Sequence, residues 1–330
     1  MKPKRLVALF LVVGALSAGV FFKKTAQRHP ANEISIAEER TLNPGLSPAF
    51  VTRIEIRQAG DSPAVLLKDA SGEWTLESRY GAPARKDTVE ALVKEFSDLR
   101  GEVRADAQDL LTDFKIDDKQ GIRIQFDLTV GKSQATYLSP LRPTAVENFV
   151  RDGGSHEVLV VKKNLLGVLG LWNKDSKIDY KAFADLRVMS ADISKISRLE
   201  LASNGRVEVS LTHRDPEGSA PAVDEWRFDS SGEPADAMEV KRLLNQLSNL
   251  FGVDALDPKT EHGFQETPSV RLREKIGTEE KEKMLFFGKA DPDSKTVAVA
   301  VRPENRVFAV PEGSLAPFAK KKTDFVPKAS

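Results

Sequence analysis

Two stretches of the chain carry the same apolar pattern: residues 81–101 (GAPARKDTVEALVKEFSDLRG) and residues 232–252 (GEPADAMEVKRLLNQLSNLFG). In both, apolar residues recur at the i, i+3, i+4, i+7 spacing of an amphipathic helix that buries one side. The two stripes consist of Val89, Leu92, Val93, Phe96 and Leu99, and of Val240, Leu243, Leu244, Leu247 and Leu250. Because the stretches align without a gap, we interpret the chain as a tandem duplication.

Residues around the two stripes support this interpretation. The expected N-caps are Asp87 and Asp236, and the expected helix-ending glycines are Gly101 and Gly252. A tryptophan precedes each helix, Trp74 in GEWTL and Trp226 in DEWRF. We expect both indoles to be core residues, and the alternative is an exposed ring that stacks on a ligand.

Segments of alternating apolar and polar residues flank each helix and predict strands. The clearest alternation is TVAVAVRP, in which Val297, Val299 and Val301 share one face. Short connections favour antiparallel pairing, and a helix with an apolar stripe must bury it against the sheet. The predicted fold class is α+β: two tandem repeats, each an antiparallel sheet with one long amphipathic helix packed on it, after an N-terminal transmembrane helix.

This interpretation divides the chain into six segments. They are an N-terminal membrane anchor (1–24), a tether (25–39), a first α+β repeat (40–171), a linker (172–186), a second α+β repeat (187–319) and a disordered tail (320–330). The tether is polar and aperiodic, and the tail is basic and contains proline, as chain ends without packed structure often are.

The start of the chain has the pattern of a targeting segment. Basic residues at positions 2, 4 and 5 precede the uncharged run from Leu6 to Phe22, and two lysines follow it. As a helix this run spans about 25 Å, and flanking lysines can make up the difference from the ~30 Å hydrocarbon core. We expect a retained single-pass anchor of the bacterial cell membrane, with the bulk of the chain periplasmic or extracellular. The alternative is a signal peptide cleaved near the small residues at 17–19.

Composition narrows the function classes. Lys+Arg and Asp+Glu both number 49, so the net charge is zero and no basic excess points to nucleic acid. Hydrophobic residues make up 40%, as in a globular chain. The chain has no cysteine, which excludes disulfides, thiolate catalysis and cysteine-based metal sites.

Candidate chemical residues are few. The four histidines are His29, His156, His213 and His262, and no two have metal-ligand spacing. The acidic clusters at Asp117–Asp118 and Asp291–Asp293 lack the frame of a calcium loop and are interpreted as turn residues. Nucleophile-elbow and phosphate-loop motifs do not occur in the sequence. We therefore predict no catalytic, cofactor-binding or metal-ligating residue, and no cofactor.

A family resemblance rests on four motifs. They are the V-x-R-I-E-I strand (51–56), the Gly-x-Trp strand (72–74), the Pro-Ala-led helix ending in Leu-x-Gly (83–101), and a Gly-Phe turn at 263–264 followed by Pro268. In these motifs, and in its N-terminal segment, the chain resembles the bacterial family of domain of unknown function 4340, over residues 40–320. The first copy departs from the pattern, because residues 115–118 lack the glycine and proline. The resemblance implies envelope proteins that accompany permeases and auxiliary subunits of gliding-type ABC transport systems.

The function predicted from these observations is contact, not catalysis. We expect a non-catalytic, membrane-anchored extracytoplasmic interaction module, accessory to a membrane assembly such as a gliding-type ABC transport system. Its expected partners are the lipid bilayer, through Leu6 to Phe22, and proteins of the cell envelope, but not nucleic acid. One alternative is a binding protein for a small ligand or glycan at the interface between the repeats. A second is a hydrolase whose site has no recognisable motif.

Overall fold

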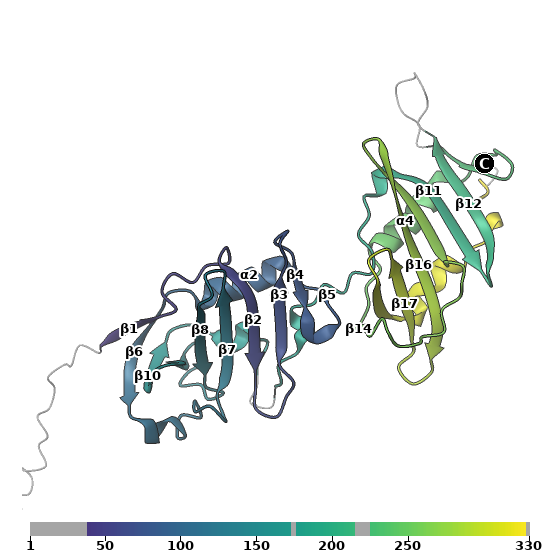
Figure 1. Ribbon diagram of the computed structural model, residues 1–330. Helices are drawn as coiled ribbons and strands as arrows, with labels where there is room; N and C mark the ends of the chain where they lie inside the picture. The colour runs from purple at the N-terminus through teal and green to yellow at the C-terminus, as the bar shows by residue number, and fades with distance from the viewer. Residues whose placement is uncertain (1–37, 173–175, 215–224, 328–330) are drawn as a thin grey trace, which may run out of the picture.

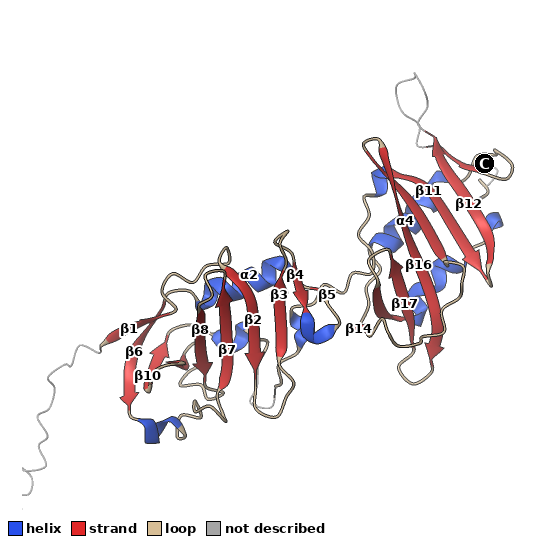
Figure 2. Cartoon of the chain, in the orientation of Figure 1, coloured by secondary structure: helices blue, strands red, loops and turns tan. Residues whose placement is uncertain are grey.

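The computed structural model describes residues 38–172, 176–214 and 225–327, and the chain in it is mostly β (Figures 1 and 2). Strands account for 42% and helix for 19%, and the strands form two antiparallel sheets. The predicted α+β class, with a long amphipathic helix as a layer of each repeat and a transmembrane helix before them, is therefore wrong. The helices are short elements beside two large sheets, and much of the helix is single 3₁₀ turns.

The first sheet has ten strands in the order β1-β6-β10-β9-β8-β7-β2-β3-β4-β5. The strands are β1 (Glu39–Leu42), β2 (Val51–Arg57), β3 (Ala64–Lys68), β4 (Trp74–Leu76), β5 (Ala82–Pro83), β6 (Leu99–Asp106), β7 (Ile122–Leu128), β8 (Ser133–Leu138), β9 (Asn148–Asp152) and β10 (Glu157–Val161). The helices beside it are η1 (Glu77–Arg79), α2 (Lys86–Phe96), η2 (Gln108–Leu111), α3 (Leu165–Val168) and η3 (Tyr180–Ala182).

The second sheet has eight strands in the order β13-β12-β11-β15-β16-β17-β18-β14. The strands are β11 (Ile196–Ser203), β12 (Arg206–Arg214), β13 (Glu225–Phe228), β14 (Asp254–Leu256), β15 (Val270–Ile276), β16 (Glu279–Asp291), β17 (Thr296–Arg302) and β18 (Arg306–Pro311). The helices are η4 (Ile193–Lys195), α4 (Ala237–Ser248), η5 (Glu312–Ala319) and η6 (Lys322–Phe325). We call residues 38–185 the first unit and residues 186–327 the second unit.

The two sheets share a strand order. The run β6-β10-β9-β8-β7-β2-β3-β4 in the first sheet corresponds to β14-β18-β17-β16-β15-β11-β12-β13 in the second. The first sheet adds β1 outside β6 and β5 outside β4. Strands of the two sheets can therefore be compared by their place in this order.

Each unit has its own hydrophobic core on one face of its sheet. The buried stripe of α2 lies in one cluster with strand residues such as Ile54 and Phe126, and the stripe of α4 lies in a second cluster. Trp74 and Trp226 are 1% and 3% exposed, which confirms that both indoles are core residues. A side chain buried in this way contributes roughly 1.5–3 kcal/mol, so the stripes are a main source of stability.

The helix ends differ from the prediction. Helix α2 ends at Phe96, Asp98 has a φ of 45°, and Leu99 pairs with Leu42 in the sheet. Gly101 therefore lies in β6 and does not end a helix. Asp236 caps α4 as predicted, by accepting hydrogen bonds from two backbone N–H groups, whereas α2 begins after Arg85 without a side-chain cap.

Among the helices of the described residues, none combines the length and the apolar character needed to cross a membrane. This finding contradicts the predicted localisation as a single-pass protein of the bacterial cell membrane. The run from Leu6 to Phe22, on which the predicted anchor and bilayer contact rest, lies outside the described residues.

Candidate functional site

The face of the second sheet opposite its hydrophobic core, here called the outer face, carries small side chains on two neighbouring strands. On β17, Val297 and Val299 point into the core, so the alternating residue Ala298 points outward. Ala309 on β18 is directly opposite Ala298, and Asp254 on β14 is opposite Ala309. Three neighbouring strands thus place two methyl groups and one carboxylate in a row across this face.

A bulge in β16 borders this row. The register shifts between Phe287 and Ala290, so Gly288 and Lys289 both face Ala298. Glycine is required here because a Cβ on Gly288 would lie 2.5 Å from the carbonyl oxygen of His262. That oxygen accepts a hydrogen bond from the backbone N–H of Lys289 at 3.1 Å. Bulges redirect side chains at functional sites, and this one holds the segment of residues 257–268 across the sheet.

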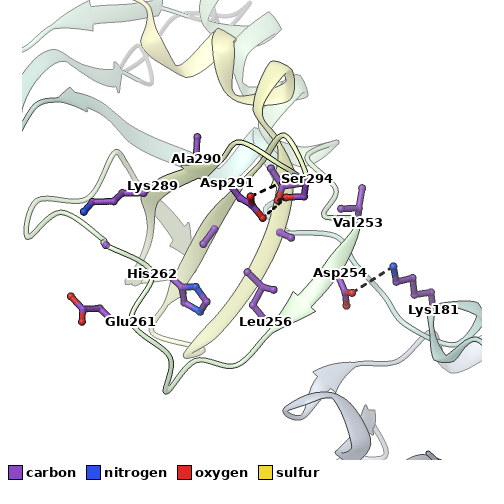
Figure 3. A pocket seen from close by; sticks show the side chains of 14 residues that line it. Lys181, Val253, Asp254, Leu256, Glu261, His262, Lys289, Ala290, Asp291 and Ser294 are labelled. Carbon is purple, nitrogen blue, oxygen red and sulfur yellow. Dashed lines mark hydrogen bonds and ion pairs between the residues drawn. The ribbon is translucent and has the colours of Figure 1, made fainter. Parts of the chain in front are cut away.

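A groove of about 720 Å³ lies between this segment and the turn that follows β16 (Figure 3). Ala298 of β17 and Ala309 of β18 line it. His262 and Leu256 lie on one side of it, and Asp291 and Ser294 lie on the other. The volume is in the range of ligand sites, roughly 300–1,000 Å³.

Two acidic side chains of the groove already have partners. Ser294 donates a hydrogen bond to Asp291 at 2.8 Å, and the backbone N–H of Asp293 donates another at 2.9 Å. These hydrogen bonds lower the pKa of Asp291 and keep it ionised. Asp254 accepts from the hydroxyl of Tyr180 and pairs with Lys181 at 3.5 Å. Neither carboxylate is therefore free for another role.

Two charged side chains at the opposite side of the groove are uncommitted. Lys289 and Glu261 line it away from the Asp254–Lys181 pair (Figure 3). Within residues 38–172, 176–214 and 225–327, neither side chain makes a hydrogen bond or an ion pair. The rim thus offers one cation and one anion to an incoming group.

Tyr180 links this groove to the first unit. Its ring lies against the guanidinium of Arg79, with the ring centroid 4.0 Å from the central carbon. Its hydroxyl donates to Asp254 of β14. Burial, reinforced by this hydrogen bond to a carboxylate, raises the pKa of Tyr180 well above its ordinary value. The tyrosine therefore stays protonated. Like Lys181, it connects the first unit to Asp254 of the second unit.

Other residues singled out from the sequence gather around a second cavity of about 560 Å³ in the first unit. Asp117 and Asp118 line it together with His156, which is distant from them in sequence. Asp117 accepts from the backbone N–H groups of Lys119 and Gln120, and these bonds lower its pKa despite the opposing effect of burial. Asp117 thus organises the turn at residues 117–120.

Arg151 holds that turn on the sheet. The side chain is 4% exposed, pairs with Asp118 at 2.7 Å and donates to the carbonyl oxygens of Ile116, Asp152 and Ser155. One carboxylate and three carbonyl oxygens therefore engage its guanidinium.

The remaining histidines do not converge. His213 lies beside Trp226, with ring centroids 5.1 Å apart, and His29 is outside the described residues. Nε2 of His262 lies 2.9 Å from the carbonyl oxygen of Asp257 and so carries the proton. The Ser294 hydroxyl, which a nearby histidine could activate, contacts Asp291 and Thr296 and not His262. Across the described part of the chain, no three histidine or acidic side chains form a group suited to a metal ion.

Comparison with known proteins identifies one family. A family model described as "Domain of unknown function (DUF4340)" matches residues 74–266. The matched range is shorter than the resemblance based on motifs, which covers residues 40–320. No curated protein and no solved structure matches the chain.

Proposed function

The chain belongs to the domain of unknown function 4340 family, and from that premise we propose that it is a non-catalytic interaction module that binds a partner protein through the groove of the second unit. One observation carries the proposal. Small residues on the outer face leave a hollow of about 720 Å³ whose rim has two uncommitted charges, Lys289 and Glu261. As partner class we propose proteins of a gliding-type ABC transport system, which the family resemblance implies.

The absence of catalysis is part of this proposal. A nucleophile needs a base within hydrogen-bond reach, commonly about 2.6–3.2 Å. Ser294 and Asp291 are within that distance, but Asp291 also accepts a hydrogen bond from the backbone of its own turn, and His262 contacts a backbone carbonyl oxygen. Their partners favour a role in shaping the groove.

The alternative of a ligand or glycan between the two repeats has less support. The groove is lined by the second unit, and Lys181 is the contribution from the residues before it. A site shared between repeats would draw walls from both sheets. The groove therefore favours a contact made by the second unit.

Photo-cross-linking in intact cells tests the proposed function. A photoreactive residue in place of Glu261 in the full chain is expected to capture one protein of the proposed partner class, a component of a gliding-type ABC transport system. The matched control is Val130, which is 70% exposed in the first unit and should not capture that partner. Ala309→Trp fills the groove and should abolish capture, whereas Ser294→Ala, which removes only a hydroxyl already bonded to Asp291, should retain it. Loss of biological function in Ser294→Ala, with capture intact, would instead indicate catalysis.

We also infer that the two units are copies of one ancestral unit. The shared strand order and the tryptophan before each helix support this inference. Superposition of the two units in an experimental structure should place Trp74 on Trp226. Indoles at unrelated positions would argue against a duplication.

A further inference from the structure

The first unit fills its outer face with its own aromatic rings. Phe149 on β9 is opposite Val160 on β10, and its ring packs edge-on against Phe114 with centroids 4.9 Å apart. The next outward pair is Tyr137 and Arg151, with the guanidinium 4.0 Å from the tyrosine ring centroid. The segment that crosses this sheet therefore rests on a filled surface.

The second unit has one aromatic ring fewer at the corresponding positions of its outer face. Strand β17 lies between β16 and β18 as β9 lies between β8 and β10. The corresponding pairs are Ala298 with Ala309, and Phe286 with Ala300. Phe264 of the crossing segment packs into the outer cluster as Phe114 does in the first unit. Ala298 therefore stands where Phe149 stands, and the groove occupies the space of the missing ring.

The surroundings of that space suit an aromatic guest. His262 lines it, and the ring of Phe264 lies next to that of His262 with centroids 5.6 Å apart, so a ring in the groove can pack against His262. Lys289 lines the same groove and makes no ion pair with the described residues. A lysine ammonium over a ring face gains cation–π attraction, as Arg151 does over Tyr137.

We propose that the groove binds an aromatic side chain of a partner polypeptide, whose ring takes over Ala298 the place that the Phe149 ring has in the first unit. The inference rests on the proposed function and specifies the chemistry of the contact. A polypeptide fits better than a free small molecule because Lys289 and Glu261 offer one charge of each sign to the residues flanking the ring. Aromatic anchors in such pockets often dominate binding energy.

Nuclear magnetic resonance of the full chain, labelled at alanine methyl groups, tests this inference with N-acetylphenylalaninamide and N-acetyltyrosinamide as probes. Both are expected to shift the Ala298 and Ala309 methyl signals saturably. N-acetylleucinamide should bind about tenfold more weakly, because it lacks the ring and cation–π contacts. Ala298→Phe should abolish the shift of the remaining Ala309 methyl signal while leaving the melting temperature unchanged or higher. Phe149→Ala, its matched counterpart, should create a second responsive site in the first unit.

If the aromatic amides bind, three further outcomes would overturn the inference. They are equal binding of the leucine amide, shifts that persist in Ala298→Phe, and free phenylalanine that binds more tightly than its blocked amide. The last outcome would identify a small-molecule site. Failure of the aromatic amides to bind, together with partner capture at Glu261, would overturn this inference alone. Binding of the amides without any capture would instead contradict the proposed function.

Discussion

A chain carrying Phe96→Ala is expected to lose about 3–5 kcal/mol of unfolding free energy in the first unit and almost none in the second. Phe96 is fully buried, and its ring centroid lies 5.7 Å from that of Phe126 across the helix–sheet contact. Removal of the ring leaves a cavity in the core of the first unit. The second core is a separate cluster, so the loss should not spread to it.

Hydrogen exchange followed by mass spectrometry in increasing urea measures the two units separately. Amides of β2 and β7 should lose protection at lower urea, whereas those of β11 and β15 should keep theirs. Leu247→Ala in α4 is the matched control, with an expected loss of about 2–5 kcal/mol confined to the second unit. Equal loss of protection in both units of either variant would mean that the cores unfold as one.

Much of the local structure could be predicted from the sequence because it depends on periodicity. Strand β17 is expected from its alternation, and the stripes of α2 and α4 from their spacing. The fold class could not be predicted from periodicity. A helix stands out in a sequence, but the class depends on how many residues pair in sheets. Leu99 illustrates this, because it continues the apolar stripe of α2 yet pairs with Leu42.

The groove could not be predicted for a related reason. The alternation of Val297, Val299 and Val301 identifies β17 as a strand, but it says nothing of the alanines between them. An outward position on an exposed strand usually carries a polar residue, so Ala298 and Ala300 are a sign that something covers or contacts that face. The depth of the groove also depends on the β16 bulge and on Gly288, and register cannot be read from one sequence. No spacing rule relates His262 to Asp291.

The second large effect is expected at Gly288, where alanine should destabilise the second unit by about 1–3 kcal/mol. The added Cβ would lie 2.5 Å from the carbonyl oxygen of His262 and 3.2 Å from that of Ala298. Both are backbone atoms, so neither can rotate away, and residues 257–268 must lift from the sheet. The hydrogen bond from Lys289 to His262 would then lengthen or break.

Urea unfolding, read by hydrogen exchange in β16 and β17, measures the destabilisation, and the aromatic amides report the state of the groove. Gly313→Ala is the matched control, because beyond its chain neighbours no atom lies within 4 Å of the position that the new Cβ would take. The stability of this control should change by less than about 0.5 kcal/mol. If Gly288→Ala is as stable as the control, residues 257–268 do not press on the sheet. This segment would then move aside for an added methyl group. It could not hold a bound aromatic ring in one position.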